Sequence, residues 1–189
     1  LTGISRKAIQ DAVLDLHTKL ATKLAQQVDD YFKVSNEKIA FALASLKKPM
    51  AWDDKQQLLR SLIETHADIV EIAIVSARGQ ELLKVYNPDL ATQKALVSRA
   101  MEAGFLSFVA SGRRTLEIVP GSTSPSLIIY YPMNKIVLAR VVVSLRNLGA
   151  RIASERIGET GFAVLIDEKG RPLLYSDKTL SSEDREAFA

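Results

Sequence analysis

The stretch "IVSARGQELLKVY" (residues 74–86) decides the fold, because two apolar runs flank a short polar turn that ends in glycine. This pattern predicts an antiparallel hairpin in which Gly79 takes the left-handed conformation. The pattern returns in "VLIDEKGRPLLYS" (residues 164–176), where Gly170 lies 91 positions after Gly79 (170 − 79). The repeated hairpin predicts two modules of similar build, the second of which opens near residue 160.

Length and composition describe a folded globular chain. The 189 residues, 47% of them hydrophobic, can fill one sizeable core or one and a half smaller ones. The net charge is only +3 and the basic residues are scattered, with "KK" and "RR" as the longest basic runs, so a nucleic-acid role has little support. The absence of cysteine excludes thiolate metal sites, disulfides and cysteine nucleophiles.

No apolar run approaches the roughly 20 residues that a membrane-spanning helix needs. The first residues, "LTGISRKAIQ", also lack the apolar centre of a signal peptide. If the protein is attached to a membrane, we therefore expect its spanning segments outside residues 1–189.

From Ser5 to Leu46, apolar residues recur at steps of three and four. This spacing predicts one helix of about 40 residues, roughly 60 Å long at about 1.5 Å per residue. Such a helix is longer than a small domain is wide, so part of it would project as a stalk or pair with a second copy. The alternative is a helix that lies across the sheet of its own domain.

Two more helices are expected before the middle of the chain. Asp53 is a candidate N-cap for "DDKQQLLRSLIETHA" (residues 53–67), whose inner face would carry Leu58, Leu59, Leu62 and Ile63. After the hairpin, "ATQKALVSRAMEAG" (residues 91–104) is predicted to be a helix that ends at Gly104.

Four further runs are typical of strands: "FLSFVAS" (105–111), "RTLEIVPG" (114–121), "SLIIYYPM" (126–133) and "IVLARVVVSL" (136–145). In the last run, alternation places Val137, Ala139, Val141, Val143 and Leu145 on a core face. The other face, which includes Arg140, is mixed enough to border a pocket or solvent. A connecting helix, "LRNLGARIASERIG" (145–158), would lead into the second hairpin.

These elements predict an α+β fold with a long N-terminal helix over residues 1–48 and a mostly antiparallel sheet module over residues 49–147. Residues 148–189 would form a connecting helix and the incomplete start of a second, similar module.

The sequence resembles the double Cache (PDC-type) sensor domains of bacterial transmembrane receptors. The membrane-proximal module of that family opens with a phrase close to G-x-T-G-[FY]-A-x-[LV]-[IV]-D-x-x-G, which "IGETGFAVLIDEKGRPLLYSD" (157–177) resembles. The hairpin "IVEIAIVSARGQELLKVY" (69–86) is similar to the first strands of the distal module. "LIIYYPM" followed by "VLARVVVSLRNLGARIASE" is similar to the passage from its last strands into the connecting helix.

The resemblance implies PAS-like modules in the periplasmic or extracellular part of an inner-membrane receptor: a histidine kinase, a diguanylate cyclase or a chemoreceptor. Such domains take part in signal transduction, in two-component systems or chemotaxis. The resemblance further implies a small-molecule ligand in the distal module and a homodimer formed through the N-terminal helix.

The distal module offers a set of polar and aromatic residues that would suit a small, anionic carboxylate ligand. The candidate ligand-binding residues are Lys84, Tyr86, Phe108, Arg113, Arg114, Tyr130 and Tyr131. Tyr130 and Tyr131 are adjacent on a strand, so they must point to opposite faces. The Arg-x-Trp-Tyr phrase of amino-acid-binding members is absent, and an α-amino-acid ligand is not expected. Taken singly, each residue also fits an ordinary core or surface role.

No catalytic constellation is present, and we expect neither an enzyme nor a cofactor. His17 and His66 are the only histidines and have no metal-ligand spacing, and neither a Walker loop nor a Gly-x-Ser-x-Gly motif occurs. Two other functions remain open from the sequence: a cytoplasmic PAS-like interaction module that dimerises through its long helix, and a structural spacer that binds no ligand.

Overall fold

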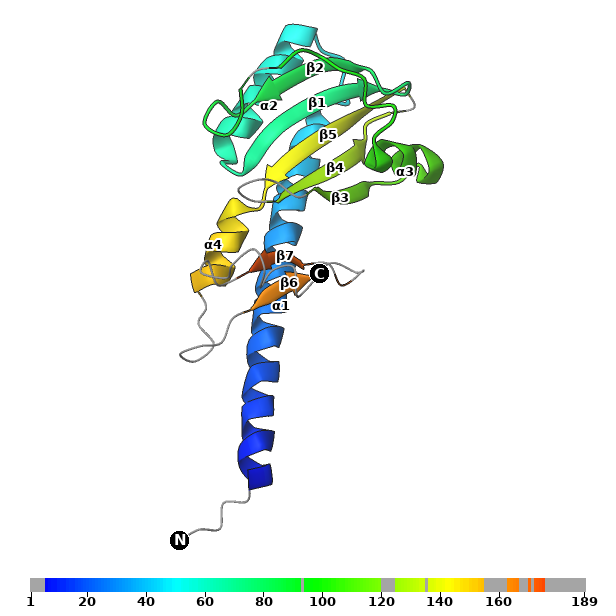
Figure 1. The fold of residues 1–189 in the computed structure, drawn as a ribbon. Coiled ribbons are helices and arrows are strands. Elements are labelled where there is room, and N and C mark those ends of the chain that lie inside the picture. The colour runs from blue at the N-terminus through cyan, green and yellow to red at the C-terminus, as the bar shows by residue number, and fades with distance from the viewer. Residues whose placement is uncertain are drawn as a thin grey trace. The chain divides into compact units, whose positions relative to one another are not determined.

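The computed structural model describes residues 6–92, 94–119, 125–134, 136–154, 163–166, 170 and 172–175. Its elements are, in order, α1 (Arg6–Ser45), α2 (Trp52–Thr65), β1 (Ile69–Ser76), β2 (Glu81–Tyr86), α3 (Ala103–Ser111), β3 (Thr115–Val119), β4 (Ser126–Pro132), β5 (Val137–Ser144), α4 (Arg146–Ser154), β6 (Val164–Ile166) and β7 (Pro172–Tyr175) (Figure 1). The predicted α+β fold class, with a long N-terminal helix and an antiparallel sheet, is confirmed.

The chain divides into two compact units, which are described separately. One unit comprises residues 35–147, and the other comprises residues 1–34 with residues 148–189. The predicted domain boundaries at residues 48 and 147 remain a prediction.

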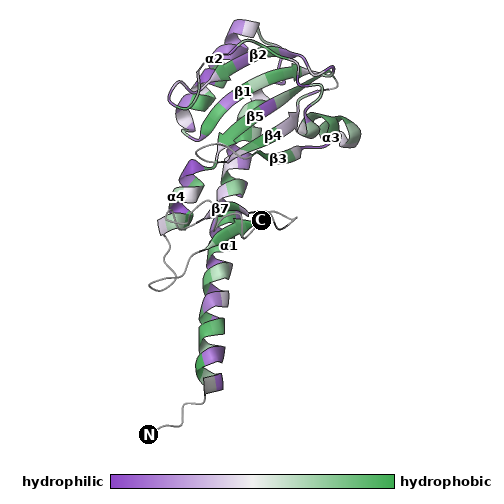
Figure 2. Cartoon of the chain, in the orientation of Figure 1, coloured by the Kyte–Doolittle hydropathy of each residue, from purple (hydrophilic) through white to green (hydrophobic). Residues whose placement is uncertain are grey.

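The unit of residues 35–147 is built on a five-stranded antiparallel sheet in the order β2-β1-β5-β4-β3. Its strands are mostly hydrophobic, with polar positions among them (Figure 2). β5 is the central strand, and in its register Arg140 lies between Ala73 of β1 and Tyr130 of β4. Side chains on one face of three strands therefore meet around Arg140.

One face of the sheet, called here the Tyr130 face, packs against α3 (Figure 1). Its core consists of Ala73, Val75, Phe105, Ile128, Tyr130, Leu138 and Val142, with Phe108 packed beside them. The rings of Phe105 and Phe108 each lie 6.5 Å from the ring of Tyr130, measured between centroids. Aromatic packing thus fixes α3 on this face.

The opposite face packs against α2, whose buried residues Leu59, Leu62 and Ile63 were predicted to face inward. The hydroxyl of Tyr131 donates a hydrogen bond of 2.7 Å to Oδ1 of Asn36, near the C-terminal end of α1. The prediction that Tyr130 and Tyr131 point to opposite faces is therefore confirmed.

Both predicted hairpins are present, in separate sheets. Gly79 joins β1 to β2 with φ 81°, and Gly170 lies between β6 and β7 with φ 78°, the left-handed conformation that glycine adopts most easily. β6 and β7 form a two-stranded sheet of their own. Gly158, Gly161, Phe162 and Asp167, from the phrase that carries the family resemblance, lie outside the described residues.

The predictions of a helix over residues 91–104 and a strand over residues 105–111 were wrong. Residues 97–99 run beside the β1–β2 turn, where Glu81 N–H donates to Val97 O at 3.1 Å and Arg99 N–H donates to Gly79 O at 2.6 Å. The main-chain groups of Val97 and Arg99 therefore bond to the hairpin, and these bonds take the place of those that a helix would provide. The helix instead starts at Ala103, where a spacing of three residues brings two phenylalanines onto Tyr130.

Two capping predictions also need correction. Gly104 lies inside α3, and Gly112, with φ 62°, ends that helix. Ala51 occupies the N-cap of α2, without a side-chain hydrogen bond, so the proposed cap at Asp53 was wrong. Asp53 and Asp54 lie in the first turn instead, where negative charge favours the helix dipole.

The long helix is confirmed as α1, a continuous helix of 40 residues. Ile39 and Leu43 in the C-terminal part of α1, and Leu46 just after it, are buried, whereas Ile9 and Val13 near its start are exposed. Pairing of the N-terminal half with a second copy remains a prediction. Over the described residues, no helix combines the length and the apolar character that crossing a membrane requires.

Candidate ligand-binding site

A network of charged side chains lies on the Tyr130 face, beneath residues 87–102, which connect β2 to α3 and are called here the covering segment. Its members are Glu71, Glu81, Lys84, Arg99, Glu102, Tyr130 and Arg140. The network holds three carboxylates and three cations, so their formal charges cancel. Four strands and the covering segment contribute to it, which makes it a tertiary feature of the whole unit.

Arg140 is the centre of the network, and the residue is only 4% exposed. Its Nη1 donates to Oε1 of Glu71 at 2.5 Å, and its Nε donates to Oε2 of Glu102 at 2.9 Å. A longer contact of 3.4 Å joins Nη2 to Oε1 of Glu102. The guanidinium therefore meets the Glu102 carboxylate with two of its nitrogens, the geometry that arginine uses for carboxylates generally.

Glu102 belongs to the covering segment and occupies the N-cap of α3, although its side chain does not cap the helix. Its carboxylate accepts hydrogen bonds from the Tyr130 hydroxyl, from Arg140 and, at 2.6 Å, from Nη1 of Arg99. Burial opposes ionisation, but the Tyr130 hydrogen bond and the charges of Arg140 and Arg99 outweigh it, so the pKa of Glu102 lies below its ordinary value.

Tyr130 is fully buried and serves as a hydrogen-bond donor. Burial and the hydrogen bond to the Glu102 carboxylate both raise the pKa of its phenol. The hydroxyl therefore keeps its proton at any physiological pH. The Glu102 carboxylate therefore meets one neutral donor, Tyr130, and two cationic donors, Arg140 and Arg99.

The second half of the network ties the covering segment to β2. The Glu81 carboxylate is fully buried, accepts from Nε of Arg99 at 2.7 Å and from the main-chain N–H of Val97 at 3.0 Å, and is paired with Lys84. Burial opposes its ionisation, but these bonds outweigh that cost and lower the pKa of Glu81. For Arg99, burial works against the charge, yet the Glu81 and Glu102 carboxylates raise its pKa.

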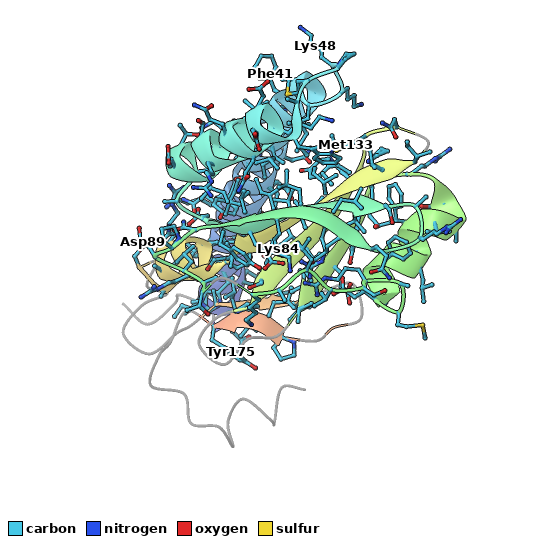
Figure 3. All side chains as sticks on the ribbon, turned by 90° about the horizontal axis from the view of Figure 1, so that it is seen from above. Phe41, Lys48, Lys84, Asp89, Met133 and Tyr175 are labelled. Atoms are coloured by element: carbon cyan, nitrogen blue, oxygen red, sulfur yellow. The ribbon has the colours of Figure 1, made fainter. Side chains whose placement is uncertain are left out.

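Lys84 and Tyr86 hold the same segment further upstream. Nζ of Lys84 donates to Ala95 O at 3.2 Å and lies 5.7 Å from the centroid of the Tyr86 ring. The Tyr86 hydroxyl donates to Lys94 O at 2.6 Å and accepts from Lys94 N–H at 3.0 Å. Figure 3 shows Lys84 inside the unit, whereas Asp89 lies at its edge. Lys84 and Tyr86, two of the predicted ligand-binding residues, thus hold the covering segment in position.

The structure brings some of the predicted residues together and separates others. Lys84, Tyr86, Phe108 and Tyr130 lie on the Tyr130 face. Tyr131 is on the opposite face, and Arg113 and Arg114 are exposed between α3 and β3. The predicted set therefore does not converge on one point, and its role in ligand binding remains a prediction.

Five charged members of the network were not among the predicted ligand-binding residues: Glu71, Glu81, Arg99, Glu102 and Arg140. A signal existed for two of them. Glu71 and Arg140 are charged residues inside otherwise apolar strand runs, which is unusual unless the charge is paired. Arg99 and Glu102 had no such signal, because their segment was predicted to be a helix.

A separate cavity of about 480 Å³ lies where β1 begins and where β2 and β5 end. Its walls come from the C-terminal end of α2 with Ala67 and Asp68, from residues 87–90, and from Ser144, Arg146 and Asn147. None of the predicted site residues lines it. No group of His, Asp or Glu side chains within the described parts of the chain has the arrangement of a metal site.

No family model matches the sequence, and comparison with curated proteins found no match. Solved structures do resemble the chain. The ligand-binding domain of the Pseudomonas aeruginosa PAO1 amino acid chemoreceptor PctB, in complex with L-Gln, has a TM-score of 0.66 at 18% identity, over 87% of this chain and 69% of that one.

Two further structures give the same result. The ligand-binding domain of the Campylobacter jejuni chemoreceptor Tlp3, in complex with 4-methylisoleucine, has a TM-score of 0.70 at 10% identity, over 96% of this chain and 79% of that one. The extracellular domain of the histidine kinase vpHK1S-Z8, itself described as putative, has a TM-score of 0.65 at 15% identity, over 98% and 79%. At these identities the likeness shows the fold: an α+β, PDC-like fold shared with sensor domains of receptors and kinases.

Proposed function

We propose that the chain is the extracytoplasmic ligand-sensing domain of a bacterial transmembrane signalling receptor, of the double Cache type. Residues 49–147 would be its membrane-distal module and residues 148–189 the start of its membrane-proximal module. The output domain would be that of a histidine kinase, a diguanylate cyclase or a chemoreceptor. The fold shared with the ligand-binding domains of two chemoreceptors and with the extracellular domain of a histidine kinase supports this proposal, and so does the absence of any catalytic motif from the sequence.

The ligand site that we propose lies on the Tyr130 face, between the sheet and the covering segment. The observation that carries it is a buried arginine, Arg140, aimed together with the Tyr130 hydroxyl at a carboxylate supplied by the covering segment. A guanidinium and a phenol in this arrangement suit a small carboxylate ligand. In the comparison structures, the bound molecules named are amino acids or close analogues, such as L-Gln and L-valine.

Signalling would follow from a change in how the covering segment is held. Glu81, Lys84 and Tyr86 bind that segment to β2, so a ligand that alters the Glu102 contact changes the balance between two arrangements of the segment. A shift from 1:99 to 99:1 needs about 5.5 kcal/mol of differential binding. Several charge-assisted hydrogen bonds in a buried site can supply this free energy.

A thermal-shift screen of small carboxylates, amines and nucleobases tests the proposal. A compound present at about 100 times its dissociation constant should add roughly 2.7 kcal/mol to the free energy of unfolding. The response should be lost in Tyr130→Phe and retained in Tyr131→Phe, a matched control that also loses one buried hydroxyl but on the opposite face. Loss of the response in both variants, or in neither, would place the ligand elsewhere.

One observation favours a second function, a spacer that binds no ligand. The charges of the network cancel, Tyr130 is fully buried, and the Glu81 side chain is inaccessible. In a spacer, this network would simply fix the fold, and no compound in the screen would raise the melting temperature.

A cytoplasmic interaction module is the remaining alternative. Inspection of the full-length gene decides between it and a receptor, because a receptor requires spanning segments on both sides of the completed pair of modules. Sedimentation of the isolated chain would test the proposed homodimer through α1.

A further inference from the structure

We infer that the Glu102 carboxylate is an internal stand-in for the carboxylate of the ligand, and that the ligand is a small monocarboxylate that takes its place on Arg140 and Tyr130. This inference rests on the proposed sensing function and names the chemical class of the ligand.

The Glu102 carboxylate is surrounded by hydrogen-bond donors. One carboxylate receives two guanidinium contacts from Arg140, at 2.9 and 3.4 Å, a third from Arg99 at 2.6 Å, and the hydroxyl proton of Tyr130. Both oxygens of the carboxylate are satisfied by these charge-assisted bonds. The position of Glu102 at the N-cap of α3 does not explain them, because its side chain does not cap the helix. A free carboxylate of the same size can accept all of these bonds without any movement of the strands.

Glu102 differs from the other two acids of the network in its exposure and in the segment that carries it. The side chain of Glu102 is 26% exposed, compared with 14% for Glu71 and 0% for Glu81. Glu71 and Glu81 belong to strands, whereas Glu102 belongs to the covering segment. Glu102 is therefore the carboxylate that can turn into water and leave its donors behind at the lowest cost.

The size of the ligand is limited, because the main chain on both sides of Glu102 is anchored. Arg99 N–H donates to Gly79 O at 2.6 Å, and Gly104 N–H donates to the Glu117 carboxylate at 3.0 Å. Gly104 also packs so tightly that an added Cβ would lie 2.5 Å from the Tyr130 ring. Displacement is therefore a rotation of the Glu102 side chain, and the space it frees is that of a short acid such as acetate or propionate.

The charge of the network favours a ligand with a single carboxylate. A monocarboxylate that replaces Glu102 leaves the network as neutral as before, because it exchanges one negative charge for another. A second carboxylate on the ligand would approach Glu71, which already shares Arg140 and Arg99. Like charges at close range in a buried site repel strongly, so a dicarboxylate such as succinate should bind less well than propionate.

The test is chemical rescue of the full 189-residue chain. Glu102→Ala removes the internal carboxylate and should lower the melting temperature at pH 7. Sodium acetate or propionate should then restore part of the loss along a saturable curve, at constant ionic strength set with sodium chloride, with succinate less effective. The matched control is Glu117→Ala, which removes a carboxylate beside the same helix end that bonds the Gly104 N–H. Equal responses to acetate in the two variants would overturn the inference.

If Glu102→Ala does not fold, Glu102→Gln keeps the shape of the side chain and removes its charge. Titration of ¹³C-labelled acetate by NMR should give at least a tenfold higher affinity for this variant than for the unmodified chain, and an unchanged affinity would overturn the inference.

Failure of the stand-in can be distinguished from failure of the proposed sensing function. A ligand without a carboxylate that binds Glu102→Gln and the unmodified chain with the same affinity would refute the role of Glu102 as a stand-in. The same result would leave the proposed sensing function in place. Rescue of Glu102→Ala by acetate, with no ligand bound by the unmodified chain, would show only that the freed space accepts a carboxylate, and it would overturn both the stand-in and the sensing function.

Discussion

Tyr130 and Tyr131 are neighbours in β4, yet their hydroxyls are bound on opposite faces of the sheet, Tyr130 to Glu102 and Tyr131 to Asn36. The first bond belongs to the charged network and the second joins the sheet to the C-terminal part of α1. Two adjacent residues of β4 therefore bind the sheet to the covering segment on one face and to α1 on the other.

The Tyr131–Asn36 bond predicts a measurable coupling between β4 and α1. Tyr131→Phe should reduce the free energy of unfolding by about 1 kcal/mol, because it leaves the Asn36 amide without its buried partner. Asn36→Ala should cost a similar amount, and a double-mutant cycle in urea should show that the two losses are not additive. Strict additivity would mean that the bond contributes nothing.

Removal of the central cation should destabilise the unit strongly. Arg140→Leu leaves Glu71 and Glu102 without their main charge partner in a buried site, and breaking a buried pair in this way typically costs about 3–5 kcal/mol. Urea unfolding followed by circular dichroism measures the loss. Arg113→Leu serves as a control, because that side chain is exposed and its replacement should change stability by no more than about 0.5 kcal/mol. Similar effects for the two substitutions would contradict the central role of Arg140.

The turn between β1 and β2 should not tolerate a side chain. Gly79→Ala and Gly112→Ala both force alanine into a left-handed conformation, which costs roughly 1–2 kcal/mol. Only at Gly79 would the new Cβ also lie 2.6 Å from the main-chain nitrogen of Ala100, whereas Gly112 has open space. Thermal unfolding should therefore show the larger loss for Gly79→Ala. Equal losses would indicate that the covering segment does not pack against the turn.

Stability should fall in acid, and Glu102 should account for part of the fall. The folded state lowers the pKa of Glu81 and Glu102 below the ordinary value of 4.5, so the unfolded chain binds their protons more tightly. Their contribution to stability is therefore complete above about pH 4.5 and is lost as the pH falls through the lower folded values. Urea unfolding between pH 3 and pH 6 should give a shallower dependence for Glu102→Gln than for the unmodified chain. Identical slopes would mean that Glu102 is not ion-paired in the folded state.

Local patterns in the sequence were sufficient for much of the fold. The helical spacing over α1, the glycine turns at Gly79 and Gly170, and the strand character of β5 each depend on residues close together in the chain. Backbone conformation follows from such short-range patterns. The opposite orientation of Tyr130 and Tyr131 was also determined in this way, because adjacent strand residues cannot share a face. Burial does not always follow from them: the alternation along β5 predicted that the face with Arg140 borders a pocket or solvent, whereas Leu138, Arg140, Val142 and Ser144 on that face are all buried.

Only the tertiary structure decided the course of residues 91–111 and the members of the charged network. The sequence of this region is compatible with a helix followed by a strand, and contacts with a turn some 20 residues upstream and with Tyr130 override that preference. Arg140 has no neighbour in sequence that predicts its partners, since Glu71 lies on another strand and Glu102 on the covering segment. A buried charge must find its counter-charge in space, and which residues the fold brings within 3 Å of it is not written in any local stretch of the chain.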